Sequence, residues 1–321
     1  MKALLLGIIA SLFFASTFVL NRAMELSGGS WVWSAALRYL FMLPPLLAIV
    51  LARGKLMDLL ADMRRRPRSW IVWSTVGFGL FYAPICFAAA FGPAWLVAST
   101  WQITIIAGAL LTPWIGPRRL RTADRPAIPL QSILISGIML LGVLVVQLHQ
   151  AGRVSSRELW LGVAPVAVAA VAYPLGNRKM MALVGDQLDT FQRVLGMTIA
   201  SLPFWLIVAA YGLVSSGRPS ASQTLQSLIV ALCSGVIATV LFFKATDLAR
   251  GDPRHLAAVE ATQAGEVVFA LVGEMALLHT ALPSLSAWIG MALVVLGMIL
   301  HSYVSHGPPV ESSAPAPTAG A

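Results

Sequence analysis

The sequence is poor in charged residues, and poorest in acids. Charged side chains make up 11% of the 321 residues, with 13 Asp and Glu against 22 Lys and Arg, while 58% of the residues are hydrophobic. An ordinary soluble domain carries about a quarter charged residues. This shortage argues against a water-soluble protein and indicates a chain surrounded by lipid.

Cysteines, metal-ligand clusters and phosphate-binding loops are also scarce or missing. The two cysteines, Cys86 and Cys233, fall within apolar stretches, which argues against a disulfide framework. The five histidines are scattered, and no glycine-rich loop ending in Lys followed by Ser or Thr is present. These absences predict a protein that is not an enzyme, hydrolyses no ATP and carries no metal or cofactor.

The formal net charge is nonetheless +9. A basic chain can bind nucleic acid, but here the basic residues stand in short segments between apolar stretches, a pattern typical of membrane proteins. We therefore expect the lipid bilayer as a partner and no nucleic acid.

Apolar residues are concentrated in ten stretches of about 20 residues, the length that crosses a hydrocarbon core about 30 Å thick. The sequence therefore predicts an all-α integral membrane protein with ten transmembrane helices. The predicted spans are 3–23, 31–51, 70–90, 94–114, 130–148, 158–177, 190–211, 224–246, 256–277 and 284–303.

The connecting segments predict the orientation, because cytoplasmic loops hold an excess of Lys and Arg. Both termini are expected in the cytoplasm, with the chain in the inner membrane, and the Pro-, Ser- and Ala-rich segment 306–321 is expected to be a disordered tail. The basic residues then placed inside are Lys2, Arg53, Lys55, Arg64, Arg65, Arg66, Arg68, Arg118, Arg119, Arg121, Arg125, Arg178, Lys179, Arg250 and Arg254.

The two halves of the chain resemble each other in order. Asn21 and Asn177 close the first and sixth spans in similar surroundings, and Arg38 and Arg193 follow them in the next span. The pattern predicts a duplicated five-helix unit, with one copy over 1–150 and the other over 151–305. Further matches pair Trp101-Gln102 with Thr262-Gln263, and Gly137 and Gly142 with Gly290 and Gly297.

Because five is an odd number, the second copy must cross the membrane in the opposite sense to the first. Such an inverted repeat is the architecture of many secondary transporters, which open a central site to one side and then to the other. The repeat therefore favours transport over a channel, a receptor or a membrane enzyme.

Four features occur together here: the five-plus-five helices, the Asn21-Arg22 pair, the basic segments after the second and fourth spans, and the glycines of the fifth and tenth spans. In this combination the chain resembles the drug/metabolite transporter superfamily. Within it, the chain is similar to the ten-helix multidrug resistance efflux transporters. The resemblance implies an exporter with a central cavity among spans one to four and six to nine. It also implies that the fifth and tenth spans lie at the edge, as scaffold or dimer contact.

Four-helix relatives in that superfamily use a membrane-embedded glutamate of their first helix for protons and cationic drugs. Here the first span holds no acid before Glu25 at its outer end, so that role does not transfer. Glu266, near the middle of the ninth span, is our main candidate for proton coupling or cation binding, because ionisable groups within a membrane often mark a pathway. Its alternative role is a structural ion pair or hydrogen bond.

The other expected substrate-binding residues are Gln102, Gln263, Tyr82, Trp101 and Tyr173. Aromatic faces bind organic cations and flat rings, and amides inside a span bind a substrate or join helices. Gln263 shares part of the helical face of Glu266, whereas Glu260 is turned about 120° away.

Arg38, Arg193, Glu260, Asn21 and Asn177 are expected to gate the cavity or to pair charges. Each arginine has a planar fork of donors for a carboxylate or a phosphate. The alternative is that the arginines extend to the nearer membrane interface or pair with Glu274 and Glu260 as gate salt bridges. If both arginines faced the cavity unpaired, an anionic or zwitterionic metabolite would be favoured over a cationic drug.

The sequence therefore predicts a secondary-active exporter of small molecules that works by alternating access, with proton-coupled multidrug efflux as one form. Export of an amino acid or another metabolite on the same fold is an alternative. A non-transporting membrane partner subunit is an alternative of another class. The sequence leaves open whether the protein forms a homodimer.

Overall fold

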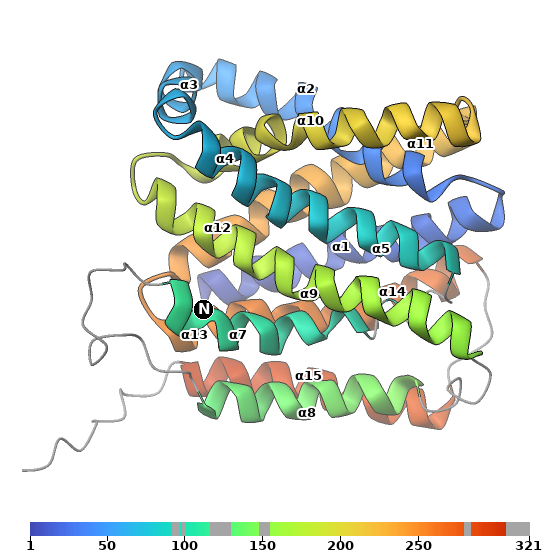
Figure 1. The fold of residues 1–321 in the computed structure, drawn as a ribbon. Helices are drawn as coiled ribbons and strands as arrows, with labels where there is room; N and C mark the ends of the chain where they lie inside the picture. The colour runs from blue at the N-terminus through green and yellow to red at the C-terminus, as the bar shows by residue number, and fades with distance from the viewer. Residues whose placement is uncertain (92–96, 98–99, 116–129, 148–154, 279–283, 306–321) are drawn as a thin grey trace, which may run out of the picture.

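The computed structural model describes residues 1–91, 97, 100–115, 130–147, 155–278 and 284–305. Every regular element within these ranges is a helix, and most of the helices run side by side along one direction (Figure 1). The first half contains α1 (Lys2–Leu26), α2 (Trp31–Ala52), α3 (Leu56–Arg65), α4 (Pro67–Ser74), η1 (Thr75–Gly79), α5 (Leu80–Phe91), α7 (Ile103–Ile115) and α8 (Leu130–Gln147). The second half contains α9 (Ser156–Val184), α10 (Thr190–Ser216), α11 (Ala221–Val230), η4 (Ala231–Ala238), α12 (Thr239–Ala249), α13 (Pro253–Ala261), η5 (Thr262–Ala264), α14 (Gly265–Leu278) and α15 (Leu285–Ser305).

Seven helical stretches within the described ranges are long and apolar enough to cross a membrane, and α8 and α15 contain shorter apolar stretches. Within these ranges the helices agree with the prediction of an all-helical membrane protein with several spans. The number of ten spans and the inverted repeat stay predictions. The fourth predicted span, 94–114, falls partly outside the described ranges, and the predicted tail 306–321 lies entirely outside them.

Three of the apolar spans depart from regular α-helix near their middle. A π-helical segment, η1, joins α4 to α5, and a second one, η4, joins α11 to α12. A short 3₁₀ segment, η5, separates α13 from α14. Irregular turns inside helices often mark functional sites, because they change the direction in which side chains point.

Two of the predicted boundaries are wrong. The segment 52–69 is predicted as a loop, yet Leu56–Arg65 forms α3, because Leu59 is buried and Asp62 accepts a hydrogen bond of 2.9 Å from the Trp70 indole. The sixth span is predicted to end at residue 177, yet α9 continues to Val184. Arg178, expected in a cytoplasmic loop, therefore lies inside a helix.

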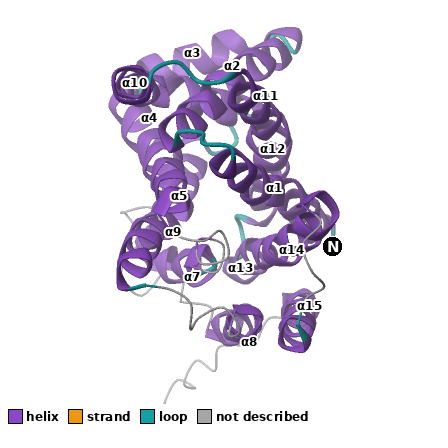
Figure 2. Ribbon diagram, turned by 90° about the vertical axis from the view of Figure 1, so that its right-hand side faces the viewer, coloured by secondary structure: helices purple, strands orange, loops and turns teal. Residues whose placement is uncertain are grey.

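The helices α8 and α15 pack against each other at one edge of the molecule (Figures 1 and 2). A Cβ atom on Gly142 would lie 2.7 Å from the Gly290 backbone oxygen, so the glycine allows the two backbones to approach closely. Met139, Val143 and Val294 fill the small core around this contact.

The main core lies among the remaining helices and is rich in aromatic rings. Tyr39 of α2 stacks on Trp205 of α10 with ring centroids 4.4 Å apart, and Tyr173 of α9 lies 4.6 Å from Phe81 of α5. These contacts join helices of the first half of the chain to helices of the second half.

Candidate functional site

A small cavity lies inside this aromatic core, where α1, α2, α5, α9 and α14 meet. The volume open to the centre of a water molecule is about 20 Å³, which is room for one or two waters. Every lining residue is buried. The lining consists of Phe14, Thr17, Phe18, Arg38, Phe81, Tyr82, Ile85, Trp101, Tyr173, Ser234, Gln263 and Glu266.

Five of the six residues expected to bind substrate line this one cavity: Glu266, Gln263, Tyr82, Trp101 and Tyr173. Tyr82 and Glu266, the two that are farthest apart in the sequence, are separated by 184 positions. The five residues come from both the first and the second half of the chain. The sixth, Gln102, is buried in the turn between Trp101 and α7 but is not part of the lining.

Arg38 and Glu266 give the cavity one basic and one acidic side chain, each 2% exposed. The Arg38 guanidinium carbon lies 4.1 Å from the centroid of the Tyr82 ring, and Glu266 shares the lining with the aromatic rings of Trp101 and Tyr173. Among the described residues, neither Arg38 nor Glu266 has an ion-pair partner within 4.0 Å, and Arg38 Nε has no hydrogen-bond partner. Both charges thus share the lining with aromatic rings.

The break between α13 and α14 positions two of the lining residues. In a 3₁₀ turn, residues three apart lie above one another. Gln263 lies within η5, and Glu266 follows it three residues later at the start of α14. The break therefore allows both side chains to face the cavity, while Glu260, in α13, takes part in a different contact.

Sequence reasoning missed the polar pair Thr17 and Ser234. Thr17 Oγ1 lies 2.6 Å from Ser234 Oγ, across the cavity lining from α1 to the π-helical η4. Small hydroxyl residues inside apolar spans are a weak signal, because they also join helices in any packed bundle. The apolar lining residues Phe14, Phe18 and Phe81 carry no sequence signal that separates them from lipid-facing residues.

Glu260 forms a buried ion pair with Arg178 of α9. Arg178 Nε and Nη2 lie 2.7 and 2.6 Å from the two carboxylate oxygens, and both side chains are 3% exposed. Gly108 of α7 lies directly against the carboxylate, where a Cβ atom would collide with Glu260. The expected pairing of Glu260 with Arg38 or Arg193 is therefore wrong, because α9 extends far enough to bring Arg178 to this acid.

Arg193 of α10 pairs with Asp247 of α12 and does not reach the cavity. Its Nη1 lies 2.6 Å from Asp247 Oδ1, and its Nη2 donates to the Phe243 carbonyl at 3.2 Å. Of the two arginines that could bind an anion in the cavity, only Arg38 lines it. The side chain of Glu274, the other expected partner, lies outside the described residues.

The two asparagines lie on either side of the core. Asn21 donates to the Tyr82 hydroxyl at 3.4 Å and contacts Cys86 Sγ at 4.0 Å. It also lines a second cavity of about 20 Å³, together with Ser34 and Cys86, near the end of the bundle where α1 meets α2. Asn177 is buried beside Arg178 in α9.

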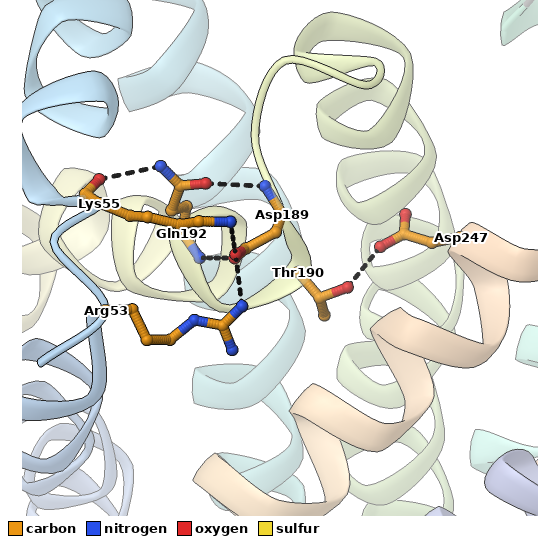
Figure 3. A network of polar contacts seen from close by, with 6 residues as sticks. All are labelled: Arg53, Lys55, Asp189, Thr190, Gln192 and Asp247. Atoms are coloured by element: carbon orange, nitrogen blue, oxygen red, sulfur yellow. Dashed lines mark hydrogen bonds and ion pairs between the residues drawn. The ribbon is translucent and has the colours of Figure 1, made fainter.

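At the opposite end of the bundle, a polar network joins the turn before α10 to the segment after α2 (Figure 3). The carboxylate of Asp189 lies 2.9 Å from both Arg53 Nη2 and Lys55 Nζ. Gln192 donates to the Lys55 carbonyl at 2.9 Å, and Thr190 donates to Asp247 at 2.7 Å. These contacts tie α2, α10 and α12 together at this end.

Asp189 is also the N-cap of α10. Its side chain accepts from the Gln192 amide at 3.0 Å, while the Gln192 side chain accepts from the Asp189 amide at 2.8 Å. Burial acts to raise the pKa of Asp189. The Gln192 amide, Lys55 and Arg53 outweigh that effect and hold the pKa below its ordinary value.

A larger hollow, of about 250 Å³, lies beside the N-terminus of α1. Its lining contains Lys2 and His255 among mostly apolar residues and holds no buried charge. The buried cavity around Arg38 and Glu266 is therefore the stronger candidate for a substrate site.

The matches to known proteins cover most of the chain. Residues 1–307 match the model of the EmrE family, described as "Putative multidrug resistance efflux transporter". The "Uncharacterized protein YjlA" of Bacillus subtilis (strain 168) is 58% identical over 313 residues, which cover 95% of each chain. An "Uncharacterized 42.1 kDa protein in intracellular alkaline protease 3'region" of Shouchella clausii is 51% identical, over 83% of this chain and 70% of that one.

One solved crystal structure superimposes with a TM-score of 0.69 and covers 94% of this chain and 96% of its own. At 20% sequence identity, this similarity shows a shared fold and carries no conclusion about a substrate.

Proposed function

Because the chain belongs to the EmrE family of multidrug resistance efflux transporters, we propose that it is a secondary-active exporter that carries a small molecule through the cavity around Arg38 and Glu266. The family places the chain among membrane transporters and not among enzymes. The proposal adds a site, a mechanism of alternating access and an inner-membrane location with both termini in the cytoplasm.

One contrast within the molecule carries the proposal. An ionisable side chain in the middle of a membrane costs about 2.5 to 3.5 kcal/mol by insertion scales, so structural charges are usually paired. Glu260 follows this rule with Arg178, and Arg193 follows it with Asp247. Arg38 and Glu266 line a common cavity, and neither has an ion-pair partner in the part of the chain that the structure describes. This is expected of groups that bind a ligand or a proton.

The helix contacts support the inverted repeat, because they are related by an exchange of the two halves. α1 packs against α14 and α12, and correspondingly α9 packs against α7 and α5. α2 packs against η4 as α10 packs against η1, while the pairs α2 with α10 and α8 with α15 each join corresponding helices.

The irregular segments repeat in the same way. The π-helical η1 and η4 lie in the third and eighth predicted spans. The turn at Gln102 and the 3₁₀ segment at Gln263 interrupt the fourth and ninth spans, at positions that the sequence match already pairs. Broken helices in corresponding places of two inverted halves are a frequent feature of transporter binding sites.

A transport measurement tests the proposal. We would reconstitute the full chain in liposomes, impose a pH gradient and measure uptake of ethidium and of radiolabelled L-leucine. We expect gradient-dependent uptake of at least one probe by the wild type and by Asp58→Asn, which changes an exposed acid of α3. Glu266→Gln is expected to lose the dependence on the gradient.

Two results would count against this account. Uptake no greater than in empty liposomes would argue for the non-transporting alternative. An unchanged response to the pH gradient in Glu266→Gln would remove Glu266 from proton coupling, even if transport persists.

A further inference from the structure

The chemistry of the cavity narrows the class of substrate, provided that the proposed transport function holds. Arg38 and Glu266 bring opposite charges to one lining, and among the described residues no ion pair joins either of them to another side chain. The two charges belong to different halves of the chain, Arg38 to α2 and Glu266 to α14. The cavity therefore offers a separate partner for an anion and for a cation.

A ligand with a single charge would satisfy only one of these groups. The other would remain buried without a partner, and leaving a buried charge unpaired is strongly unfavourable. A purely cationic drug would satisfy Glu266 and leave Arg38 unpaired beside it. A neutral ligand would bring a charged partner to neither group.

The polar atoms around each charge fit two different ligand groups. The guanidinium of Arg38 presents a planar fork of donors, which matches a carboxylate, and its Nε has no hydrogen-bond partner. Near Glu266, Trp101 and Tyr173 provide aromatic faces that attract an ammonium group. The Tyr173 hydroxyl, also without a hydrogen-bond partner, can add an oxygen acceptor.

Apart from Thr17, Ser234 and Gln263, the rest of the lining is apolar. Phe14, Phe18, Phe81 and Ile85 provide most of the surface that carries no polar group. We propose that the substrate is a small zwitterion with an apolar body, whose carboxylate binds Arg38 and whose ammonium group binds Glu266. Because the closed cavity has room for only one or two waters, the helices that line it must separate to admit this ligand.

Three ligands that differ only in their charged groups test the proposal. L-leucine carries both groups, 3-methylbutylamine keeps only the ammonium group, and 4-methylpentanoate keeps only the carboxylate. Binding to the purified full chain at pH 7 would be measured by isothermal titration calorimetry. We expect L-leucine to bind the wild type at least tenfold more tightly than either of the other two.

Variants of Arg38 and Glu266 test which of the two side chains binds each charged group of the ligand. Arg38→Gln is expected to weaken L-leucine binding tenfold or more and to leave the amine unaffected or improved. Glu266→Gln is expected to weaken L-leucine equally and to spare 4-methylpentanoate. Arg38→Lys keeps the charge and should retain the preference for L-leucine over the amine, while Asp58→Asn should bind all three ligands as the wild type does.

The ranking of ligands on the wild type needs no variant, so it stands even if a variant misfolds. Equal binding of the amine and L-leucine would overturn the zwitterion proposal, and so would failure of all three ligands to bind. If the same protein transports ethidium under a pH gradient, the proposed exporter function survives that outcome. If it transports neither probe, both proposals fail together.

Discussion

At the scale of single residues, the buried charges divide into those that have a partner and those that line the cavity. Arg178 and Glu260 satisfy each other with two short hydrogen bonds, and Gly108 leaves the space that their contact needs. Arg38 and Glu266 line the cavity together with the aromatic rings of Tyr82, Trp101 and Tyr173. The first pair is expected to matter for stability and the second for ligand binding.

Arg178→Met tests the structural pair. The change leaves the Glu260 carboxylate buried and unpaired, so we expect the free energy of unfolding in detergent to fall by about 3 to 5 kcal/mol. A double variant, Arg178→Met with Glu260→Leu, removes both charges and should recover most of that loss. Arg250→Met is the control, because its partner Asp186 is exposed, and surface pairs contribute little.

Thermal or denaturant unfolding of the purified protein measures these differences. If Arg178→Met were as stable as the wild type, the ion pair would not hold α9 to α13.

The sequence located Glu266 because an acid in the middle of an apolar span stands out. The sequence misleads at Arg178, because charged residues usually indicate the end of a span. Here a buried partner, Glu260, lies 82 residues away in the sequence and allows Arg178 to remain inside α9. Thr17 and Ser234 escaped notice, since hydroxyl residues are common in packed membrane helices.

At the scale of helices, the sequence predicts some of the packing and misses several of the helices and their breaks. The family resemblance implies that the fifth and tenth spans lie at the edge, as scaffold or dimer contact, but it does not predict that α8 and α15 pack against each other. The position of Gly142 explains how the two backbones approach. The helix α3 was not expected, because its short amphipathic stretch lies between basic residues and resembles a loop in its composition. The breaks at η1, η4 and η5 also have no clear signal in hydropathy.

Gly142→Ala and Gly137→Ala form a matched pair of variants on the same helix. A Cβ on Gly142 would lie 2.7 Å from the Gly290 oxygen, whereas a Cβ on Gly137 has no atom within 4 Å. We expect Gly142→Ala to lower the melting temperature. Gly137→Ala should leave it unchanged or raise it, because alanine favours a helix by about 1 kcal/mol over glycine. Equal effects at both positions would contradict the packing described for α8 and α15.

Asp189 allows a test of the polar network by pH. Its pKa is lowered in the folded protein, so the charge stabilises the fold above about pH 4, the ordinary aspartate range. That stabilisation is lost as the pH falls through the lower, folded-state pKa. Asp189→Asn keeps a capping oxygen but removes the charge, so it should be less stable than the wild type at pH 7, with a gap that narrows below pH 4.

Asp189→Ala removes the cap as well and should cost about 1 kcal/mol more than Asp189→Asn. Unfolding curves recorded from pH 7 to pH 3 would check both expectations. A gap between wild type and Asp189→Asn that stays constant down to pH 3 would contradict a charge-based role.

At the scale of the whole molecule, helices from both halves of the chain meet at the cavity, and a polar network around Asp189 lies at one end of the bundle. The network of Asp189 joins the α2–α3 segment of the first half to the turn before α10 of the second half (Figure 3). The excess of Lys and Arg favours a cytoplasmic location for this end. Alternating access then requires that these contacts separate when the cavity opens to the cytoplasm.

A reversible cross-link across this network tests that claim most directly. Lys55→Cys and Asp189→Cys would be combined in a chain whose Cys86 and Cys233 are replaced by alanine. The two thiols would be joined by a short bifunctional methanethiosulfonate, which forms a reducible disulfide with each cysteine and releases sulfinate, and the protein would be reconstituted in liposomes. The flux of whichever probe the wild type carries, ethidium or L-leucine, is the measurement. The two single-cysteine variants treated with the same reagent are the controls. We predict that the cross-link abolishes flux and that reduction restores it, whereas full flux through a completely cross-linked protein would contradict alternating access between the two halves.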